Sequence, residues 1–450
     1  MNIKTQFDHL SHIAKLSLPA LLAVTAPALM HIADTIVLSK LGNDTFMHAL
    51  MVLPIVILLI QISASALGGA ITTATAKASV HEGHEQVAAV IRSGLFASGL
   101  FATAFIVLFS LGTSPRLPWS KSWSLPDASY EYGLAFCLSA TLMWISNALA
   151  ASLRGFSDFK STMQHSWIVL ALYCLLGALV MRVAVHESEI VKLRLAAAAL
   201  CLPYAFIFPI QLLALKRWCP LNELFSGAVF PSFPPLLRQA AVAAVAPLIA
   251  SLTAQVVIAT FTLPELRPAM PILGMGMRIE YVISILMFGL GTVALSVLAR
   301  KLAQRAFTLA SETIIAVLTL AVLVLSVIIL PFFVNFDFLL NFLNWTNIDM
   351  MLVRPYVLFV IPTYYLYGTG LVLFFCLQAA QAPQFGVIAT ALRFAAVVVA
   401  LLSAHSLNVL SATSVFQILG SSFILYWFLM LMFTHKTYAH KSSMQPMLKI

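Results

Sequence analysis

Long apolar stretches alternate with short polar segments along almost the whole chain. Twelve stretches reach the roughly 20 mostly apolar residues that a helix needs to cross a membrane. They are too long, and too little alternating, for the strands of a membrane β-barrel. The pattern therefore predicts an all-α integral membrane protein with twelve transmembrane helices, at about 16–38, 46–75, 90–112, 130–153, 161–185, 193–217, 235–261, 269–299, 308–333, 354–380, 385–407 and 415–435.

The composition supports a lipid environment for most of the chain. Hydrophobic residues make up 61% of the 450 residues and charged residues 9%, whereas soluble domains have about 45–50% and about 25%. This excludes a soluble enzyme and a disordered chain. The five cysteines lie in or beside apolar stretches, where cysteine acts as a small hydrophobic residue.

Twelve spans place both termini on one side of the bilayer. With the termini inside, the inner segments carry fifteen of the 25 Lys and Arg residues and the outer segments eight. Positive residues favour the cytoplasmic side, so we expect a multi-pass protein with both termini cytoplasmic. The net charge of +9 then reflects topology and contact with lipid headgroups. No basic segment carries interleaved aromatic residues, so no nucleic-acid partner is expected.

The chain contains an internal repeat of six spans. Similar motifs recur at like places in the two halves, and Pro19 of the first span matches Pro247 of the seventh; the motif pairs are 67–70 with 290–293 and 154–157 with 378–381. An even number of spans per copy gives both copies the same orientation, as in many transporters. We therefore expect two pseudo-symmetric six-helix lobes, 1–217 and 237–450, joined by a Pro-rich cytoplasmic linker at 218–236.

Asp34 is the strongest candidate for a functional residue. An Asp at the centre of a spanning helix costs about 2.5–3.5 kcal/mol on insertion scales. Pro27 lies seven residues earlier, about two helical turns, and removes a helical hydrogen bond so that the helix can bend. We interpret Asp34 as the proton- or ion-coupling group and Pro27 as the hinge. A structural Asp bonded to a neighbouring helix is the alternative, and His31 and Thr35 flank it.

Other polar residues within the spans are candidates for substrate or vestibule contacts. Glu280 and Arg278 open the eighth span, where they could attract cations or form a structural ion pair. The mid-span amides Gln255 and Asn147 could contact substrate or hold helices together. Tyr365, with its neighbours Tyr364 and Tyr367, could offer aromatic faces to a cation or simply pack. Arg393, near the end of its span, is interpreted as an anchor reaching the interface.

Four motifs resemble the multidrug and toxic compound extrusion (MATE) family over nearly the whole chain, and the resemblance is nearest to its DNA-damage-inducible protein F-like branch. They are Leu18-Pro19 with Asp34-Thr35, Leu67-Gly68-Gly69 leading to Lys77, 153–158, and the Gly-rich segment 274–281. The resemblance implies a two-lobed, V-shaped, ion-driven exporter of organic cations and drugs in the plasma (inner) membrane. It implies no cofactor besides the coupling ion.

The sequence departs from this family at several acidic positions. The DNA-damage-inducible branch has Asn and Asp in the fifth span facing the first, and here the matching positions hold Tyr173 and Gly177. The sodium-coupled branch has a Glu in the seventh span, where this chain has Gln255, and an Asp in the tenth, which here contains no acid. Both H⁺ and Na⁺ therefore remain open as coupling ions.

The leading hypothesis is a secondary antiporter that exports organic cations in exchange for H⁺ or Na⁺, working as a monomer. The alternative is a flippase for a lipid-linked sugar or peptidoglycan precursor, although only Arg278 and Arg393 offer positive charge within the spans. We expect no enzyme, because no interface carries the clustered acids or histidines of a catalytic site. The segment 81–85 does not match a zinc motif, so no metal site is expected.

Overall fold

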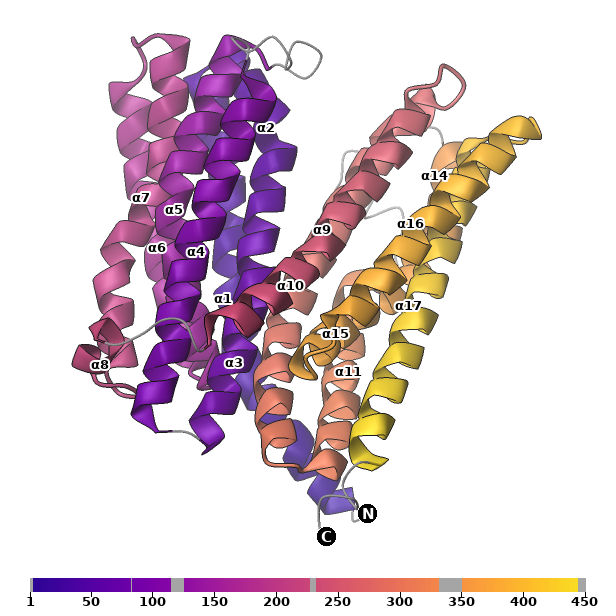
Figure 1. The fold of residues 1–450 in the computed structure, drawn as a ribbon. Helices are drawn as coiled ribbons and strands as arrows, with labels where there is room; N and C mark the ends of the chain where they lie inside the picture. The colour runs from indigo at the N-terminus through magenta and orange to yellow at the C-terminus, as the bar shows by residue number, and fades with distance from the viewer. Residues whose placement is uncertain (1–2, 82, 115–124, 227–231, 332–349, 444–450) are drawn as a thin grey trace. The chain divides into compact units, whose positions relative to one another are not determined.

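The computed structural model describes residues 3–81, 83–114, 125–226, 232–331 and 350–443 (Figure 1). Every regular element in these ranges is a helix. In the first half they are α1 (Ile3–Leu41), α2 (Asn43–Gln61), the π-helix η1 (Ile62–Leu67), α3 (Gly68–His81), α4 (His84–Thr113), α5 (Asp127–Gly155), α6 (Phe159–Val183), α7 (Glu189–Leu215) and the short α8 (Leu221–Phe225).

The second half repeats this order of long helices. Its elements are α9 (Phe233–Phe261), the short η3 (Arg267–Ala269), α10 (Met270–Ala303), α11 (Phe307–Ile329), α14 (Met350–Phe359), the 3₁₀ turn η4 (Ile361–Thr363), α15 (Tyr364–Ala379), α16 (Pro383–Ser406) and α17 (Ala412–Ser443). Among the described residues, twelve helices are long and apolar enough to cross a membrane. The expected all-α membrane architecture is thus confirmed.

Two of the expected spans contain an interruption that hydropathy does not reveal. The second is divided by η1, where the Ser65 hydroxyl donates to the Gln61 carbonyl at 2.6 Å. The tenth is divided by η4, which contains Pro362 and therefore lacks one backbone N–H. Breaks of this kind mark places where a helix leaves the regular hydrogen-bond ladder.

The chain folds into two compact units. We call Leu18–Ala244 the N-unit, and Val245–Ile450 together with Met1–Ser17 the C-unit. Both boundaries lie inside continuous helices, α1 and α9. The described residues of the expected linker, 218–226 and 232–236, belong to the N-unit.

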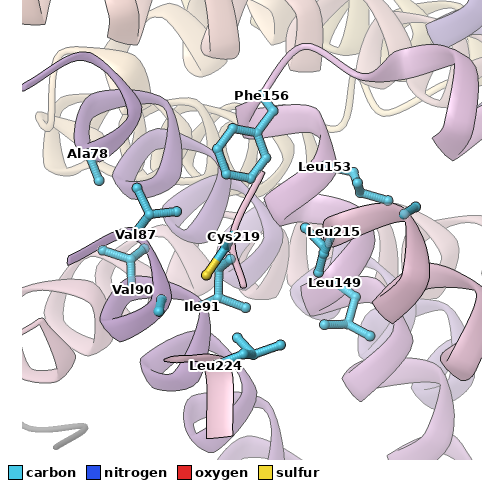
Figure 2. Packing of buried hydrophobic residues seen from close by; sticks show 12 residues of the cluster. Ala78, Val87, Val90, Ile91, Leu149, Leu153, Phe156, Leu215, Cys219 and Leu224 are labelled. Atoms are coloured by element: carbon cyan, nitrogen blue, oxygen red, sulfur yellow. The ribbon is translucent and has the colours of Figure 1, made fainter. Parts of the chain in front are cut away.

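Side chains from this linker complete a hydrophobic core in the N-unit. Cys219 and Leu224 are buried against residues of α3, α4, α5 and α7 (Figure 2), and the Phe156 and Trp218 rings stack with centroids 4.9 Å apart. A guanidinium nitrogen of Arg92 on α4 donates to the backbone carbonyls of Glu223 and Ser226. The segment after α7 is therefore held on the N-unit by apolar packing and hydrogen bonds.

The two units share the same internal plan, which confirms the repeat. In the N-unit α5 packs against α3, α4 and α7, and in the C-unit α15 packs against α10, α11 and α17, the helices at matching positions. The turn after each central helix is also the same. Ser157 and Gln381 have φ of 60° and 58°, and the N–H groups of Asp158 and Ala382 donate to the carbonyls of Leu153 and Leu377. Each turn satisfies carbonyls at the end of its helix.

Candidate functional site

Asp34 lies inside the N-unit and not on its lipid-facing surface. Its side chain extends from α1, and the residue is 8% exposed. The Tyr173 hydroxyl, on α6, donates a hydrogen bond of 2.9 Å to its Oδ1 atom. Tyr173 itself is 1% exposed. The acid and the phenol therefore form a buried hydrogen-bonded pair that links two membrane-spanning helices.

Further polar side chains surround this pair. Tyr132 on α5 and Cys201 on α7 are both buried and lie close enough to Asp34 for its charge to act on them. Tyr204, one turn after Cys201, is buried beside that cysteine. Four helices of the N-unit, α1, α5, α6 and α7, thus contribute to an enclosed, mostly phenolic environment around one carboxyl group.

A glycine allows α1 and α6 to approach at this point. A Cβ atom at Gly177 would lie 2.9 Å from Cγ2 of Val37 and 3.9 Å from the Tyr173 hydroxyl. Contacts below 3.0 Å are not tolerated without a shift of one partner, so a larger residue here would separate the helices. The positions matched to the Asn and Asp of the family's fifth span therefore lie against the first helix, but in this chain they are Tyr173 and Gly177.

The residues that flank Asp34 on α1 have different surroundings. Thr35 is exposed, and its hydroxyl donates to the His31 carbonyl of the same helix at 3.0 Å. This hydroxyl therefore makes a hydrogen bond within α1. His31 is partly buried. Pro27 lies inside α1, which stays continuous from Ile3 to Leu41. The structure thus shows this helix without a break at the expected hinge.

The mid-span amides have contrasting positions. Asn147 is half-buried in the N-unit, where its Nδ2 donates to the Ser63 hydroxyl of η1 at 3.0 Å. The neighbouring Ser146 hydroxyl donates to Oε1 of Gln211 at 2.9 Å. These bonds join α5 to η1 and α7. Gln255, by contrast, is exposed on α9.

The aromatic and charged candidates of the C-unit differ in how far they are buried. Tyr365 is half-buried and donates to the Ser326 hydroxyl at 3.1 Å. Arg278 is exposed, whereas Glu280 on the same helix is partly buried. The Tyr367 hydroxyl shares a hydrogen bond of 3.1 Å with Ser284 and lies beside the Glu280 carboxylate.

Arg393 corrects the sequence-based interpretation. It is 6% exposed and lies within the C-unit, with its guanidinium carbon 4.3 Å from the centre of the Phe423 ring. Its charge acts on Glu280, which comes from a different helix. The interpretation as an interfacial anchor was wrong because the distance from a span's end does not reveal which face of the helix packs inward.

Two buried tyrosines, Tyr356 and Tyr364, lie next to Tyr367 and Glu280. The Tyr356 and Tyr364 hydroxyl oxygens are 2.5 Å apart, and Tyr364 donates to the Gly276 carbonyl at 3.0 Å. Tyr364 is also in ring contact with Tyr367. The group of tyrosines at 364–367 was the sequence signal for this cluster, but the part played by Arg393 had no such signal.

The described residues contain no group of three or more His, Cys, Asp or Glu side chains that could hold a metal ion. Of the segment 81–85, Glu82 lies outside the described residues.

Comparison of the sequence with family profiles and with curated proteins gives no match. Comparison of the fold gives clear matches to solved transporters. A MOP superfamily transporter from Pyrococcus furiosus aligns with a TM-score of 0.81 at 15% identity, over 96% of both chains. A MATE protein aligns in a straight conformation (TM-score 0.81, 14% identity, 97% of both chains) and in a bent one (0.82, 15%, 96% of both). The chain therefore has the fold of the MATE transporters of the MOP superfamily.

Proposed function

We propose that this protein is a secondary antiporter of the plasma membrane, with cytoplasmic termini, that exports organic cations in exchange for an inward-moving ion. The observation that carries the proposal is the Asp34–Tyr173 pair, a carboxyl group enclosed within a bundle of membrane-spanning helices and bonded across to α6. Ionisable groups at such depth are rare and mark ion or proton pathways. The transporter fold of the solved relatives supports the same conclusion.

The occupancy of Asp34 would change the contact between α1 and α6. An ionised carboxylate only accepts hydrogen bonds, so it holds the Tyr173 hydroxyl as a donor. A neutral or ion-bound carboxyl holds it less strongly, because hydrogen bonds to charged groups are the stronger ones. Pro27, about two turns along the helix, provides a place where α1 can bend in response. The solved MATE structures in straight and bent conformations are in keeping with such a change.

The surroundings of Asp34 favour a proton over Na⁺ as the coupling ion. A hard cation in a protein site takes several oxygen ligands. Here the side chains around the carboxyl group are two phenols and the thiol of Cys201, and sulfur suits softer metals. A proton needs a single carboxylate oxygen. If exchange were driven by Na⁺, further oxygen ligands would have to join Asp34 around the ion.

Exchange follows if the proton and the cargo favour different states of α1. Each ligand can shift the equilibrium only by its difference in affinity for the two states. The proton would favour one shape of the helix and the organic cation the other, so the binding of one releases the other. No direct contact between the two sites is needed.

The alternative is a flippase for a lipid-linked sugar or peptidoglycan precursor. Buried Arg393 favours it, because a guanidinium group suits a phosphate. Arg278 is exposed. Among the described residues, the other buried arginine is Arg154, which lies in the last turn of α5 in the N-unit. We therefore retain the antiporter as the main proposal.

The test uses purified protein in proteoliposomes loaded with ethidium. An outward movement of dye driven by an imposed pH gradient, with no response to an imposed Na⁺ gradient, is expected. A response to Na⁺ alone would contradict proton coupling. Failure to move any organic cation, together with movement of a fluorescent lipid-linked precursor, would replace the antiporter with the flippase.

A further inference from the structure

A single residue connects α1 to α2 in the N-unit. α1 ends at Leu41 and α2 begins at Asn43, so Gly42 alone lies between them. Gly42 has a φ of 145°, a backbone conformation that residues with a side chain rarely adopt. Its carbonyl accepts a hydrogen bond of 3.0 Å from the Phe46 N–H in the first turn of α2. A shift of the end of α1 therefore has to move or distort the first turn of α2.

The first turn of α2 is in turn bonded to α7. The Thr45 hydroxyl donates to Oε2 of Glu189, the first residue of α7, at 2.7 Å. Thr45 is 0% exposed, and the Lys192 ammonium nitrogen lies 3.7 Å from Oε1 of the same carboxylate. A short hydrogen bond to a charged acceptor is stronger than one between neutral groups. We call this Thr45–Glu189 hydrogen bond the outer clamp, because the predicted topology places it on the outer side of the membrane.

The outer clamp restrains the part of α1 that carries Asp34. Asp34 lies seven residues before Leu41, about two turns along the same helix. It is bonded to α6 through Tyr173, whereas the outer clamp fastens the end of α1 to α7 by way of α2. This part of α1 is therefore held at two places. A change in the occupancy of Asp34 acts on only one of them.

Other polar contacts at this end of the N-unit lie farther from α1. Nδ1 of His48, in the next turn of α2, is 3.0 Å from the Ser129 hydroxyl of α5. Arg194 on α7 forms an ion pair of 2.7 Å with Glu131 on α5. By contrast, Oγ1 of Thr45 lies 3.4 Å from the place where a Cβ atom of Gly42 would be. The outer clamp is thus the contact at the junction itself, while the ion pair joins two helices that do not continue α1.

We propose that Thr45 and Glu189 are positioning residues of the exchange cycle, and that the outer clamp opens each time α1 changes shape. This inference rests on the proposed export function and deepens it by naming the contact that restrains α1. A bond that is made in one shape of the helix and broken in the other stabilises the first shape and so sets the balance between the two. The alternative is a static bond that stays closed throughout the cycle.

The test locks the outer clamp with a reversible cross-link. Thr45→Cys and Glu189→Cys are combined in a Cys174→Ser background, because Cys174 is the exposed cysteine of the chain. The two thiols are joined by the short reagent 1,2-ethanediyl bismethanethiosulfonate, and mass spectrometry gives the cross-linked fraction. Ethidium movement driven by a pH gradient is measured in proteoliposomes before cross-linking, after it, and after reduction with dithiothreitol. We expect exchange to be lost in proportion to the cross-linked fraction and to return on reduction.

The ion pair between α5 and α7 supplies the matched control. Glu131→Cys combined with Arg194→Cys places the same cross-link at the same end of the N-unit, without involving α1 or α2. Exchange by this cross-linked protein should be unchanged. Full exchange with the outer clamp cross-linked would overturn the proposal, because locking a static bond changes nothing. Equal loss of exchange with both cross-links would also overturn it, since the effect would then not be particular to α1.

A second measurement needs no transport. Spin labels on Lys40→Cys of α1 and Arg182→Cys of α6, two exposed positions near the ends of their helices, report the distance between these helices by pulsed electron paramagnetic resonance. Adding Thr45→Val removes the hydroxyl but keeps the side-chain shape, and the distance distribution should broaden. Adding Glu131→Gln instead should leave it unchanged.

The same distribution with and without the Thr45 hydroxyl would contradict a restraint on α1. If the Thr45→Val protein does not fold, Glu189→Ala removes the acceptor of the same bond and decides. The distance measurement can succeed when the protein exchanges no cation, which would reject the proposed function and leave the restraint. Exchange that continues through a cross-linked outer clamp would reject the clamp and leave the proposed function.

Discussion

The Tyr173 hydroxyl lies 2.9 Å from Oδ1 of Asp34, and this bond connects α1 to α6 within the N-unit. Both residues are buried. In a medium of low dielectric constant such a bond is strong, and its loss leaves a polar group without a partner. Under the proposed function, this bond would link the charge state of Asp34 to the packing of α1 against α6.

Replacing Tyr173 with Phe should slow exchange. The phenol donates a hydrogen bond from α6 to the Asp34 carboxyl group on α1, and removing one partner of a buried hydrogen bond costs about 1–3 kcal/mol. The rate of gradient-driven exchange in proteoliposomes should fall about tenfold. Tyr204→Phe is the control, since Tyr204 is buried in the same unit and its hydroxyl has no described bond to Asp34. An unchanged exchange rate in the Tyr173 variant would show that the bond does not affect coupling.

Replacing Gly177 with Ala should push α1 away from α6. The added methyl group would meet Val37 at 2.9 Å, and overpacking of this kind costs about 1–3 kcal/mol. The thermal unfolding temperature and the exchange rate should both fall. In contrast, Gly99→Ala on α4 adds a methyl group with nothing within 4 Å and should retain or gain stability through helix propensity. Equal behaviour of the two variants would contradict the close approach.

Replacing Pro27 with Ala should stiffen α1. Alanine restores the backbone N–H that proline lacks and so favours a straight helix. We expect slower exchange with little change in protein yield. Pro19→Ala places the same chemical change in another part of α1 and should affect exchange less. Equal exchange by the Pro27 variant and the unaltered protein would remove this residue from the mechanism.

The thiol of Cys219 should react slowly with alkylating reagents. Burial, aided by the charge of Glu223, raises the pKa of this thiol, while Arg92 opposes the shift. The thiolate is the reactive form, so its fraction at a given pH falls, and alkylation should accelerate only at higher pH than for a free cysteine. Mass spectrometry after iodoacetamide treatment gives the rate.

A Ser226→Cys variant is the control for this measurement, because Ser226 is exposed in the same segment. Its thiol should be modified much faster than Cys219. Comparable rates at the two positions would show that the segment after α7 is not packed on the N-unit in solution.

Hydropathy predicted the twelve helices because membrane spans must be long, apolar and internally hydrogen-bonded. The repeat was predicted from motifs that recur in the two halves. Hydropathy did not predict the interruption at Pro362, because a proline in an apolar stretch can end, bend or remain within a helix. Likewise it did not reveal the π-helix Ile62–Leu67, because a π-helix has the same apolar pattern over so short a segment as an α-helix.

The site was only partly predictable for a related reason. Asp34 stood out because an acid in a span is costly, and the resemblance placed Tyr173 opposite it. Exposure of Gln255 and burial of Arg393 depend on how each helix is rotated against its neighbours. That rotation comes from packing between helices distant in the sequence, and a single span does not encode it.

Gradient-driven exchange by Asp34→Asn protein tests the central claim most directly. Asparagine keeps the shape and a hydrogen-bond acceptor for Tyr173 but cannot carry a proton. In proteoliposomes, ethidium movement driven by a pH gradient should disappear, while expression and thermal stability stay near those of the unaltered protein. The exposed Asp44→Asn control should retain exchange. Full exchange by the Asp34 variant would contradict the account.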